Sequence, residues 1–390
     1  MDYNRVWGCP VVFGCDPEFF FATKSGKIVG SEKVIPSGGL PFEGRLLYDT
    51  GRGSYIQDGV QVEINPQAKG CRGNLGNEIG VAFRTLRKHL EGMDGLTVSF
   101  RSVVEVDKEE LASLSEKSRI LGCQPSLNIH DKAATIAVNP ATFRTRSAGG
   151  HVHMGLNTHL IPHAVRLVPI LDVLLGNTCV LIDRDPLAAE RRKVYGRAGE
   201  YRLPKHGLEY RTLSNFWLRS YQLMSFVMGL VRLSNHVLHT TVMNDASARL
   251  GGPQRWDAEA KLLSYVDMSL IRKAINGNNR DLALKNWEGV KKFIQDHVSN
   301  YNNTTLQNDN TANFELFANL VHERGIEYWF PEDPMEHWSK VGAQNPISEP
   351  ESAGRLDGNY NGIESFLARI HEKQAYADAA YEKVQNAKQV

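Results

Sequence analysis

Acidic and basic side chains that could bind a metal ion and a phosphate occur in four short segments of the first 215 residues. The first segment, GCDPEFFFA at Gly14 to Ala22, has two acids two residues apart. Because successive side chains of a β-strand point to opposite faces, Asp16 and Glu18 are expected on one face. Two carboxylates on one face favour a hard divalent cation, although a polar strand end beside Pro17 explains the same pattern.

The second segment, VQVEINP at Val60 to Pro66, alternates apolar and polar residues. This alternation predicts a half-buried strand with Glu63 on its polar face. That face is either solvated, as one side of an antiparallel sheet commonly is, or part of a site. Asp58 precedes the segment and is expected in the loop that leads to it.

The third segment, GGHVHMG at Gly149 to Gly155, holds two histidines that share a strand face by the same rule. Glycines on both sides of His151 and His153 allow close approach by a ligand or by another backbone. A histidine pair at this spacing suits a metal or a polyphosphate, whereas a lone histidine is more often a structural residue.

The fourth segment spans residues 195–215 and reads YGRAGEYRLPKHGLEYRTLSN, in which EYR occurs twice around an LPKHG turn. The repeat predicts a β-hairpin whose two tyrosines, Tyr201 and Tyr210, pack inward. Side chains expected to share a face are Glu200 with Arg202 and Glu209 with Arg211. A surface ladder of salt bridges explains this pattern, and so does a metal-binding carboxylate beside guanidiniums that bind phosphate oxygens.

Together, the segments bring at least four carboxylates, two histidines and two to four arginines onto polar strand faces. A polyanion held by several divalent cations fits this set, because Mg²⁺ takes oxygen ligands and usually bridges phosphates. Nucleotide use is the natural inference. The sequence has no Walker A motif and no strand-linked GxGxxG, so neither a P-loop nor a Rossmann cradle is expected.

Short apolar runs broken by turn signals predict strands in the first half of the chain. Helical spacing predicts helices at 74–92, 163–182, 216–244, 281–300, 313–324 and 362–388. Polar linkers are expected at 245–257 and 346–360. We therefore expect an α+β fold with a catalytic domain at 1–250 and a mainly helical C-terminal region at 251–390.

The composition is that of a globular protein, with 42% hydrophobic and 23% charged residues among 390. Nucleic acid is not expected as a partner, because 45 basic residues are balanced by 44 acidic ones. Five scattered cysteines without a CxxC pair indicate reduced thiols. No signal peptide is recognisable and no apolar run approaches membrane-spanning length, so a cytoplasmic protein without a membrane partner is expected.

The four segments resemble motifs of the glutamine-synthetase superfamily, in particular its carboxylate–amine ligase (amidoligase) branch, with phage-encoded members most similar. GCDPEFFF resembles the opening G-x-E-x-E-F strand, QVEINP the second acidic strand, and GGHVHMG the G-x-H-x-H strand. RLP from Arg202 and LEYRTLSN from Leu208 resemble the late R-x-P and E-x-R segments. The resemblance implies a glutamine synthetase/guanido kinase-like antiparallel sheet with packed helices, followed by the helical C-terminal region.

The resemblance also implies roles for individual residues. It implies five metal ligands: Asp16, Glu18, Glu63, His151 and Glu209. Asp16 and Glu18 would bind different ions, and Asp58 is a candidate for a second acid beside Glu63. Nucleotide binding is implied for His153, Arg202, Arg211 and Lys205. The arginines implied to stabilise the transferred phosphoryl group are Arg197, Arg202 and Arg211.

The activity implied is the ATP-dependent joining of a carboxylate to an amine through an acyl phosphate, with Mg²⁺ or Mn²⁺ as the cation. Small-molecule or peptide carboxylates and amines would be the substrates, in the host cytoplasm if the chain is phage-encoded. A metal-dependent hydrolase is an alternative, because H-x-H with carboxylates also suits zinc. A non-catalytic binding or virion module on the same fold is another. The sequence leaves the substrates and a homo-oligomeric state open.

Overall fold

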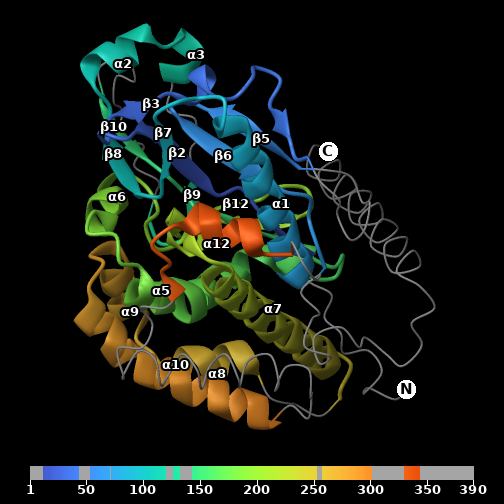
Figure 1. The fold of residues 1–390 in the computed structure, drawn as a ribbon. Helices are drawn as coiled ribbons and strands as arrows, with labels where there is room; N and C mark the ends of the chain where they lie inside the picture. The colour runs from blue at the N-terminus through green and yellow to red at the C-terminus, as the bar shows by residue number, and fades with distance from the viewer. Residues whose placement is uncertain are drawn as a thin grey trace, which may run out of the picture.

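A computed structural model describes residues 12–43, 53–70, 72–119, 126–131, 143–252, 257–300 and 329–342. Every pair of strands in these ranges is antiparallel, and helices pack around the sheets (Figure 1). The predicted α+β class is confirmed. The helices predicted at 313–324 and 362–388 lie outside the described residues, as does the linker predicted at 346–360.

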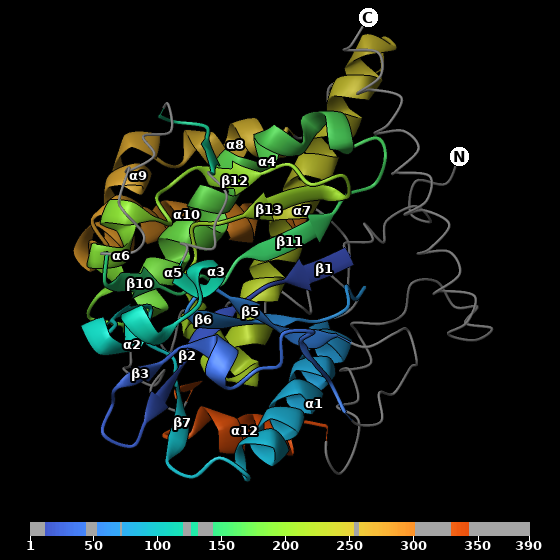
Figure 2. The ribbon, with the colours of Figure 1, turned by 90° about the horizontal axis from the view of Figure 1, so that it is seen from above.

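The first sheet has five strands in the order β1-β11-β13-β12-β9, and the first four can be followed in Figure 2. Its strands are β1 (Val12–Cys15), β11 (Val152–Gly155), β13 (Gly207–Tyr210), β12 (Glu200–Arg202) and β9 (Leu127–Asn128). In register, Gly14 faces His153, which faces Glu209. Glu209 in turn faces Arg202. One row of the sheet therefore carries a histidine, a carboxylate and a guanidinium side by side.

The second sheet has six strands, ordered β3-β2-β6-β5-β4, with β7 also paired to β2. They are β2 (Glu18–Thr23), β3 (Ile28–Val29), β4 (Leu40–Pro41), β5 (Ser54–Asp58), β6 (Gln61–Asn65) and β7 (Leu96–Ser99). A smaller pair joins β8 (Val103–Glu105) to β10 (Thr145–Ser147). The half-buried strand predicted around Glu63 is confirmed as β6, whereas Asp58 is the last residue of β5 and not part of a loop.

The prediction of a single strand beginning at Gly14 is wrong, because the chain passes from the first sheet to the second within that segment. Strand β1 ends at Cys15, and β2 begins at Glu18 in the other sheet. Pro17 lies at the crossing, where its missing N–H could not continue the hydrogen-bond ladder. Its carbonyl instead accepts a hydrogen bond of 3.0 Å from the Ile64 N–H of β6.

Most of the longer predicted helices are confirmed. Two of them are α1 (Arg72–Leu90) and α10 (Arg280–Asn300). The third is a continuous helical run made of η3 (Ile161–Arg166), α4 (Leu167–Leu171), η4 (Asp172–Gly176) and α5 (Asn177–Ile182). The helix predicted at 216–244 is interrupted at Ser220, between η5 (Asn215–Arg219) and α7 (Tyr221–Arg249). Helix α7 continues to Arg249, so residues 245–249 are helical and the linker expected at 245–257 was placed to begin too early.

Short helices were missed by the sequence pattern. They are η2 (Ser31–Lys33), α2 (Lys108–Ser113), α3 (Glu116–Arg119), α6 (Ala188–Val194), α8 (Ala258–Ser264), α9 (Met268–Asn276) and α12 (Pro334–Lys340). Six of these segments, of three to seven residues, complete too few turns for a hydrophobic period to show. The nine-residue α9 does carry Leu270, Ile271, Ala274 and Ile275 at helical spacing, and the prediction overlooked it.

The hydrophobic core continues across residue 250, where a domain boundary was expected. Trp338 of α12 stacks on Phe83 of α1 with ring centroids 5.9 Å apart, and α12 lies beside α1 in Figure 1. The indole of Trp338 also donates a 2.6 Å hydrogen bond to the Leu218 carbonyl. Trp287 of α10 is fully buried in the same core. The last described helix thus packs on the first.

One helical stretch, Ile161–Ile182, is long and apolar enough to cross a membrane, with a mean hydropathy of 1.8. The expectation that no apolar run approaches that length is therefore wrong. Of the most apolar 18 residues in this stretch, 83% are buried inside the protein. Its apolar side chains fill the core, which accounts for the composition.

Candidate active site

The two sheets meet at the short crossing between β1 and β2, where the first two candidate ligands lie. The Glu18 N–H donates to the Gly149 carbonyl at 2.9 Å, which ties β2 to the segment before β11. The Asn215 side chain donates to the Glu18 carbonyl at 2.8 Å. These contacts bring carboxylates of both sheets to one place.

The first cluster consists of Asp16, His151, His153 and Glu209. Asp16 lies 3.2 Å from both histidines, through Oδ1 to Nδ1 of His151 and through Oδ2 to Nε2 of His153. Nδ1 of His151 is also 3.7 Å from Oε1 of Glu209. Atoms of Asp16, His153 and Glu209 lie within 4.8 Å of one another, close enough to hold one metal ion.

The first cluster leaves several buried polar atoms without a hydrogen bond. They are Asp16 Oδ1, His151 Nδ1, His153 Nε2 and Glu209 Oε1, which lie in ion-pair contacts of 2.9 to 3.7 Å that lack hydrogen-bond geometry. Most buried polar atoms in proteins are hydrogen-bonded, so four such atoms that face one another need an explanation. Two carboxylate oxygens and two imidazole nitrogens are a donor set that fits a divalent cation.

The electrostatics of the first cluster favour the cation-binding forms of Asp16 and His151. Burial alone would raise the pKa of Asp16, but His151 and then His153 hold it well below its usual range. Burial lowers the pKa of His151 despite the neighbouring carboxylate of Asp16. Asp16 is therefore ionised and His151 neutral at pH 7, which are the forms that bind a cation. Burial would lower the pKa of His153, but the neighbouring Asp16 carboxylate raises it, so a cation bound there would replace a proton of that ring.

The second cluster consists of Glu18, Asp58 and Glu63, whose carboxylate oxygens lie within 4.8 Å of one another. Glu18 and Glu63 face each other across the β2–β6 pair. Glu18 is buried and accepts a 2.7 Å hydrogen bond from the Gly149 N–H. The structure thus separates Asp16 and Glu18 into different clusters, and it places Asp58, the candidate for a second acid beside Glu63, with Glu18 and Glu63.

Burial and the charges of neighbouring acids raise the pKa values of all three acids in the second cluster. Burial, followed by the charge of Asp58, raises the pKa of Glu18 to about 8. Burial, followed by the charges of Asp16 and Glu18, raises the pKa of Glu63 to about 10. The pKa of Asp58 is also raised, first by burial. A divalent cation at this position would offset the repulsion, since bound cations reverse the local preference for protonation.

The predicted hairpin is confirmed as β12 and β13, with Tyr201 and Tyr210 paired and buried as expected. On the opposite face, Nη1 of Arg202 is 3.6 Å from Oε2 of Glu209, and the Arg202 side chain is 31% exposed. Lys205 is exposed in the turn. The hairpin therefore offers accessible positive charge beside the first cluster.

His206, which the sequence pattern did not single out, also belongs to this edge of the site. Its ring stacks on that of His153 with centroids 5.7 Å apart and an interplanar angle of 28°. It occupies the turn of the hairpin, where the KHG sequence gave a turn signal but no indication of what the ring would contact.

Arg211 lies inside the protein, with 1% of its side chain exposed. Its Nε is 2.9 Å from Oε1 of Glu209, and its Nη1 donates to Oγ of Ser126 at 2.9 Å. Its guanidinium lies 4.9 Å from the centre of the Tyr195 ring. These contacts hold Glu209 from the interior side of the first cluster.

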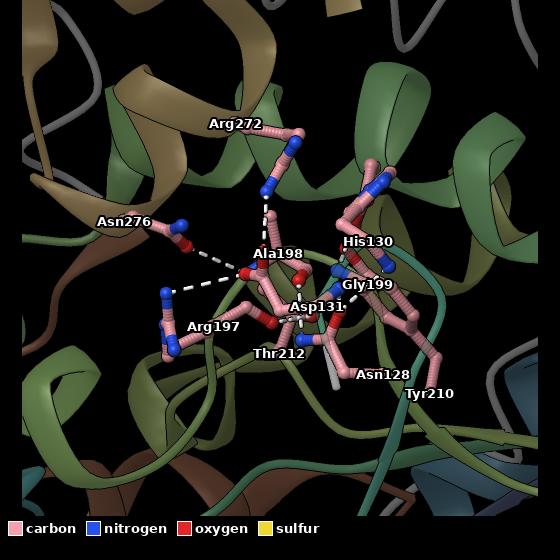
Figure 3. Close-up of polar contacts among 11 residues, drawn as sticks. Asn128, His130, Asp131, Arg197, Ala198, Gly199, Tyr210, Thr212, Arg272 and Asn276 are labelled. Carbon is pink, nitrogen blue, oxygen red and sulfur yellow. Dashed lines mark hydrogen bonds and ion pairs between the residues drawn. The ribbon is translucent and has the colours of Figure 1, made fainter. Parts of the chain in front are cut away.

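Arg197 pairs with a different set of residues. Its Nη2 is 3.3 Å from Asp131, whose other oxygen pairs with Arg272 of α9 at 2.9 Å (Figure 3). The adjacent Ala198 N–H donates to the side chain of Asn276, also on α9. Within the described part of the chain, no ion pair or hydrogen bond joins the Arg197 guanidinium to either cluster.

The glycines of the GGHVHMG segment make room for the protein's own groups. A Cβ on Gly149 would collide with the ring of His151, which lies over it. A Cβ on Gly150 would meet the Ser214 carbonyl and the indole nitrogen of Trp217. The close approach expected at these glycines is therefore made by a side chain and a neighbouring backbone.

Residues 124–252 match a family model described as phage phiEco32-like COOH.NH2 ligase-type 2. The match confirms the resemblance to phage-type carboxylate–amine ligases that the motifs indicated. It includes β11 and the β12–β13 hairpin, and it does not extend to the crossing at Asp16 or to β6. No curated protein matches the chain in sequence.

Proposed function

We propose that this chain, similar over residues 124–252 to phage COOH.NH2 ligases, is an ATP-dependent carboxylate–amine ligase that works through an acyl phosphate with Mg²⁺ or Mn²⁺. The observation that carries the proposal is the pair of adjacent clusters, joined by the two-residue step from Asp16 to Glu18. Two such clusters suit a substrate that needs more than one cation, as a nucleoside triphosphate does.

The ligand sets would divide between the two clusters. Asp16, His153 and Glu209 would hold one ion, with Nδ1 of His151 turned to the same place. Glu18, Asp58 and Glu63 would hold the other, through oxygen atoms alone. When bound, such ions neutralise the β- and γ-phosphates and orient the γ-phosphoryl group. An oxygen-only set favours magnesium or manganese over zinc, which supports the ligase over a zinc hydrolase.

The reaction needs no nucleophile from the protein. An oxygen of the substrate carboxylate attacks the γ-phosphorus, and the bond from that phosphorus to the bridging oxygen of ADP breaks. The amine then attacks the carbonyl carbon of the acyl phosphate, phosphate leaves, and the nitrogen loses a proton as the amide forms. The protein contributes position and charge, which dominate catalysis of phosphoryl transfer.

The arginines of the hairpin have different places in this proposal. The partly exposed fork of Arg202 would contact the transferred phosphoryl group, because it opens beside the first cluster. Buried Arg211 would position Glu209. Lys205 would contribute charge to nucleotide binding from the turn.

A screen for ADP release tests the proposal directly. The purified chain is incubated with ATP, Mg²⁺, and pools of amino acids and short peptides that supply both carboxylates and amines. We expect ADP to form only with a carboxylate present, and EDTA to abolish it. Glu18→Gln should remove the activity, whereas Glu190→Gln, an exposed carboxylate on α6, should not. Turnover that survives EDTA, or hydrolysis supported by Zn²⁺ alone, would contradict the proposal.

A further inference from the structure

Tyr195 contacts the first cluster from the end of α6. Its hydroxyl oxygen lies 2.7 Å from Nε2 of His151, and the two rings meet edge to face with centroids 5.5 Å apart. Its own ring lies close to two cations, 5.0 Å from the guanidinium of Arg191 and 4.9 Å from that of Arg211. Cation–π contacts of this kind favour a fixed position of the aromatic ring.

Arg191, which contacts the Tyr195 ring, is itself held in place by backbone hydrogen bonds. It is 1% exposed and donates three hydrogen bonds to backbone carbonyls, those of Ala148, Thr212 and Leu213, at 2.9 to 3.1 Å. Ala148 precedes the histidine strand, and the other two residues follow β13. One buried guanidinium therefore joins two of the three chain segments that carry the first cluster, those of the histidines and of Glu209, to the helix end that carries Tyr195.

The two ring nitrogens of His151 face different partners. Nδ1 is turned toward Asp16 and Glu209 at 3.2 and 3.7 Å, and it has no hydrogen-bond partner among the residues described. A neutral imidazole carries one proton, and a nitrogen that binds a metal must be without it. If Nδ1 faces the cation, Nε2 must carry the proton. The group within reach of that proton is the Tyr195 hydroxyl.

We propose that Tyr195 is a positioning residue, whose hydroxyl oxygen accepts a hydrogen bond from the Nε2–H of His151 and so keeps Nδ1 unprotonated and turned into the first cluster. Histidines that bind metals commonly have the other N–H held in this way, usually by a carboxylate or carbonyl. The inference rests on the proposed function, because it requires a cation in the first cluster.

Manganese binding to Tyr195→Phe tests this role, with Tyr201→Phe as the matched control on the opposite face of the hairpin. Binding is measured by electron paramagnetic resonance on the full chain, titrated with Mn²⁺ alone. We expect Tyr195→Phe to weaken one of two sites by about 10- to 100-fold, the usual effect of removing such a partner. The other site, and both sites of Tyr201→Phe, should bind as in the parent.

Nuclear magnetic resonance of ¹⁵N-histidine reports the proton directly. In the parent protein with Mg²⁺, the His151 ring should be protonated at Nε2, and this result does not depend on the folding of any variant. A ring protonated at Nδ1, or equal Mn²⁺ affinity in Tyr195→Phe and the parent, would overturn the role of Tyr195. If the parent bound no Mn²⁺ at all, the proposed function itself would fail, which is a distinct outcome.

Discussion

Replacing Glu63 by glutamine should stabilise the cation-free protein while removing a ligand of the second cluster. Glu63 faces Glu18 across the sheet, and burial together with the neighbouring acids raises its pKa from 4.5 to about 10. At pH 7.5 the cation-free folded protein therefore keeps a proton on Glu63 that the unfolded chain has released. Glutamine has a similar shape and no such proton to lose.

The size and sign of the effect follow from that difference in bound protons. Between pH 4.5 and 10 the folded state holds more protons than the unfolded state, so the free energy of unfolding falls as the pH rises. Each pH unit above 4.5 lowers the free energy of unfolding by about 1.4 kcal/mol through Glu63. At pH 7.5 the decrease amounts to about 4 kcal/mol. This is an upper bound, because Glu18 and Asp58 share the same repulsion.

Urea denaturation of the parent and Glu63→Gln proteins in EDTA, at pH 4.5 and 7.5, measures this difference. We expect the variant to gain stability relative to the parent between the two pH values, by about 4 kcal/mol at most. Adding Mg²⁺ at pH 7.5 should stabilise the parent more than the variant. The reasoning is refuted if the difference between the two proteins is the same at both pH values, or if Mg²⁺ stabilises them equally. Glu190→Gln is the control.

Three further perturbations probe other parts of the account. Arg202→Lys should lower kcat about 100-fold in the ADP-release assay with a much smaller change in the KM for ATP, because lysine keeps the charge and loses the planar fork. An unchanged kcat would mean that Arg202 does not contact the transferred phosphoryl group. Arg211→Lys should weaken Mn²⁺ binding at the first cluster about 10-fold or more, because the Arg211 guanidinium holds the Glu209 carboxylate in place. Equal Mn²⁺ affinity would mean that Glu209 holds its position without Arg211. The ring nitrogens of buried His236 on α7 and His297 on α10 lie 3.0 Å apart, and this pair should make the fold acid-labile. Burial lowers the pKa of His297 from 6.5 to about 4. The free energy of unfolding should therefore fall by about 3 kcal/mol as the pH drops from 6.5 to 4. His297→Asn should show a smaller loss over that pH range in urea denaturation, and an equal loss would assign the acid sensitivity elsewhere.

Local periodicity predicted which residues share a face of a strand, and it did so correctly where the strand partners are near in sequence. The hairpin of Tyr201 and Tyr210 and the half-buried strand of Glu63 follow from alternation within a few residues. The helices that repeat over several turns, such as α1 and α10, follow from the same kind of reasoning.

What the sequence pattern could not supply is contact between distant segments. The meeting of Glu18 with Glu63 and Asp58 depends on the sheet order, and the pairing of Arg211 with Ser126 joins residues 85 positions apart. Alternation gives the face of a strand but not whether that face is covered, so the burial of Arg211 was not foreseen. The crossing at Pro17 could not be distinguished from a continuous strand by spacing alone.

In the proposed reaction, the two clusters hold the cations that bind the phosphates of ATP. A crystal structure with Mn²⁺ and a non-hydrolysable ATP analogue, with anomalous scattering used to locate manganese, tests it most directly. We expect two manganese ions, one among Asp16, His153 and Glu209 and one among Glu18, Asp58 and Glu63. We also expect the γ-phosphate beside Arg202. Clusters that contain no manganese, with the analogue bound elsewhere or absent, would contradict this placement.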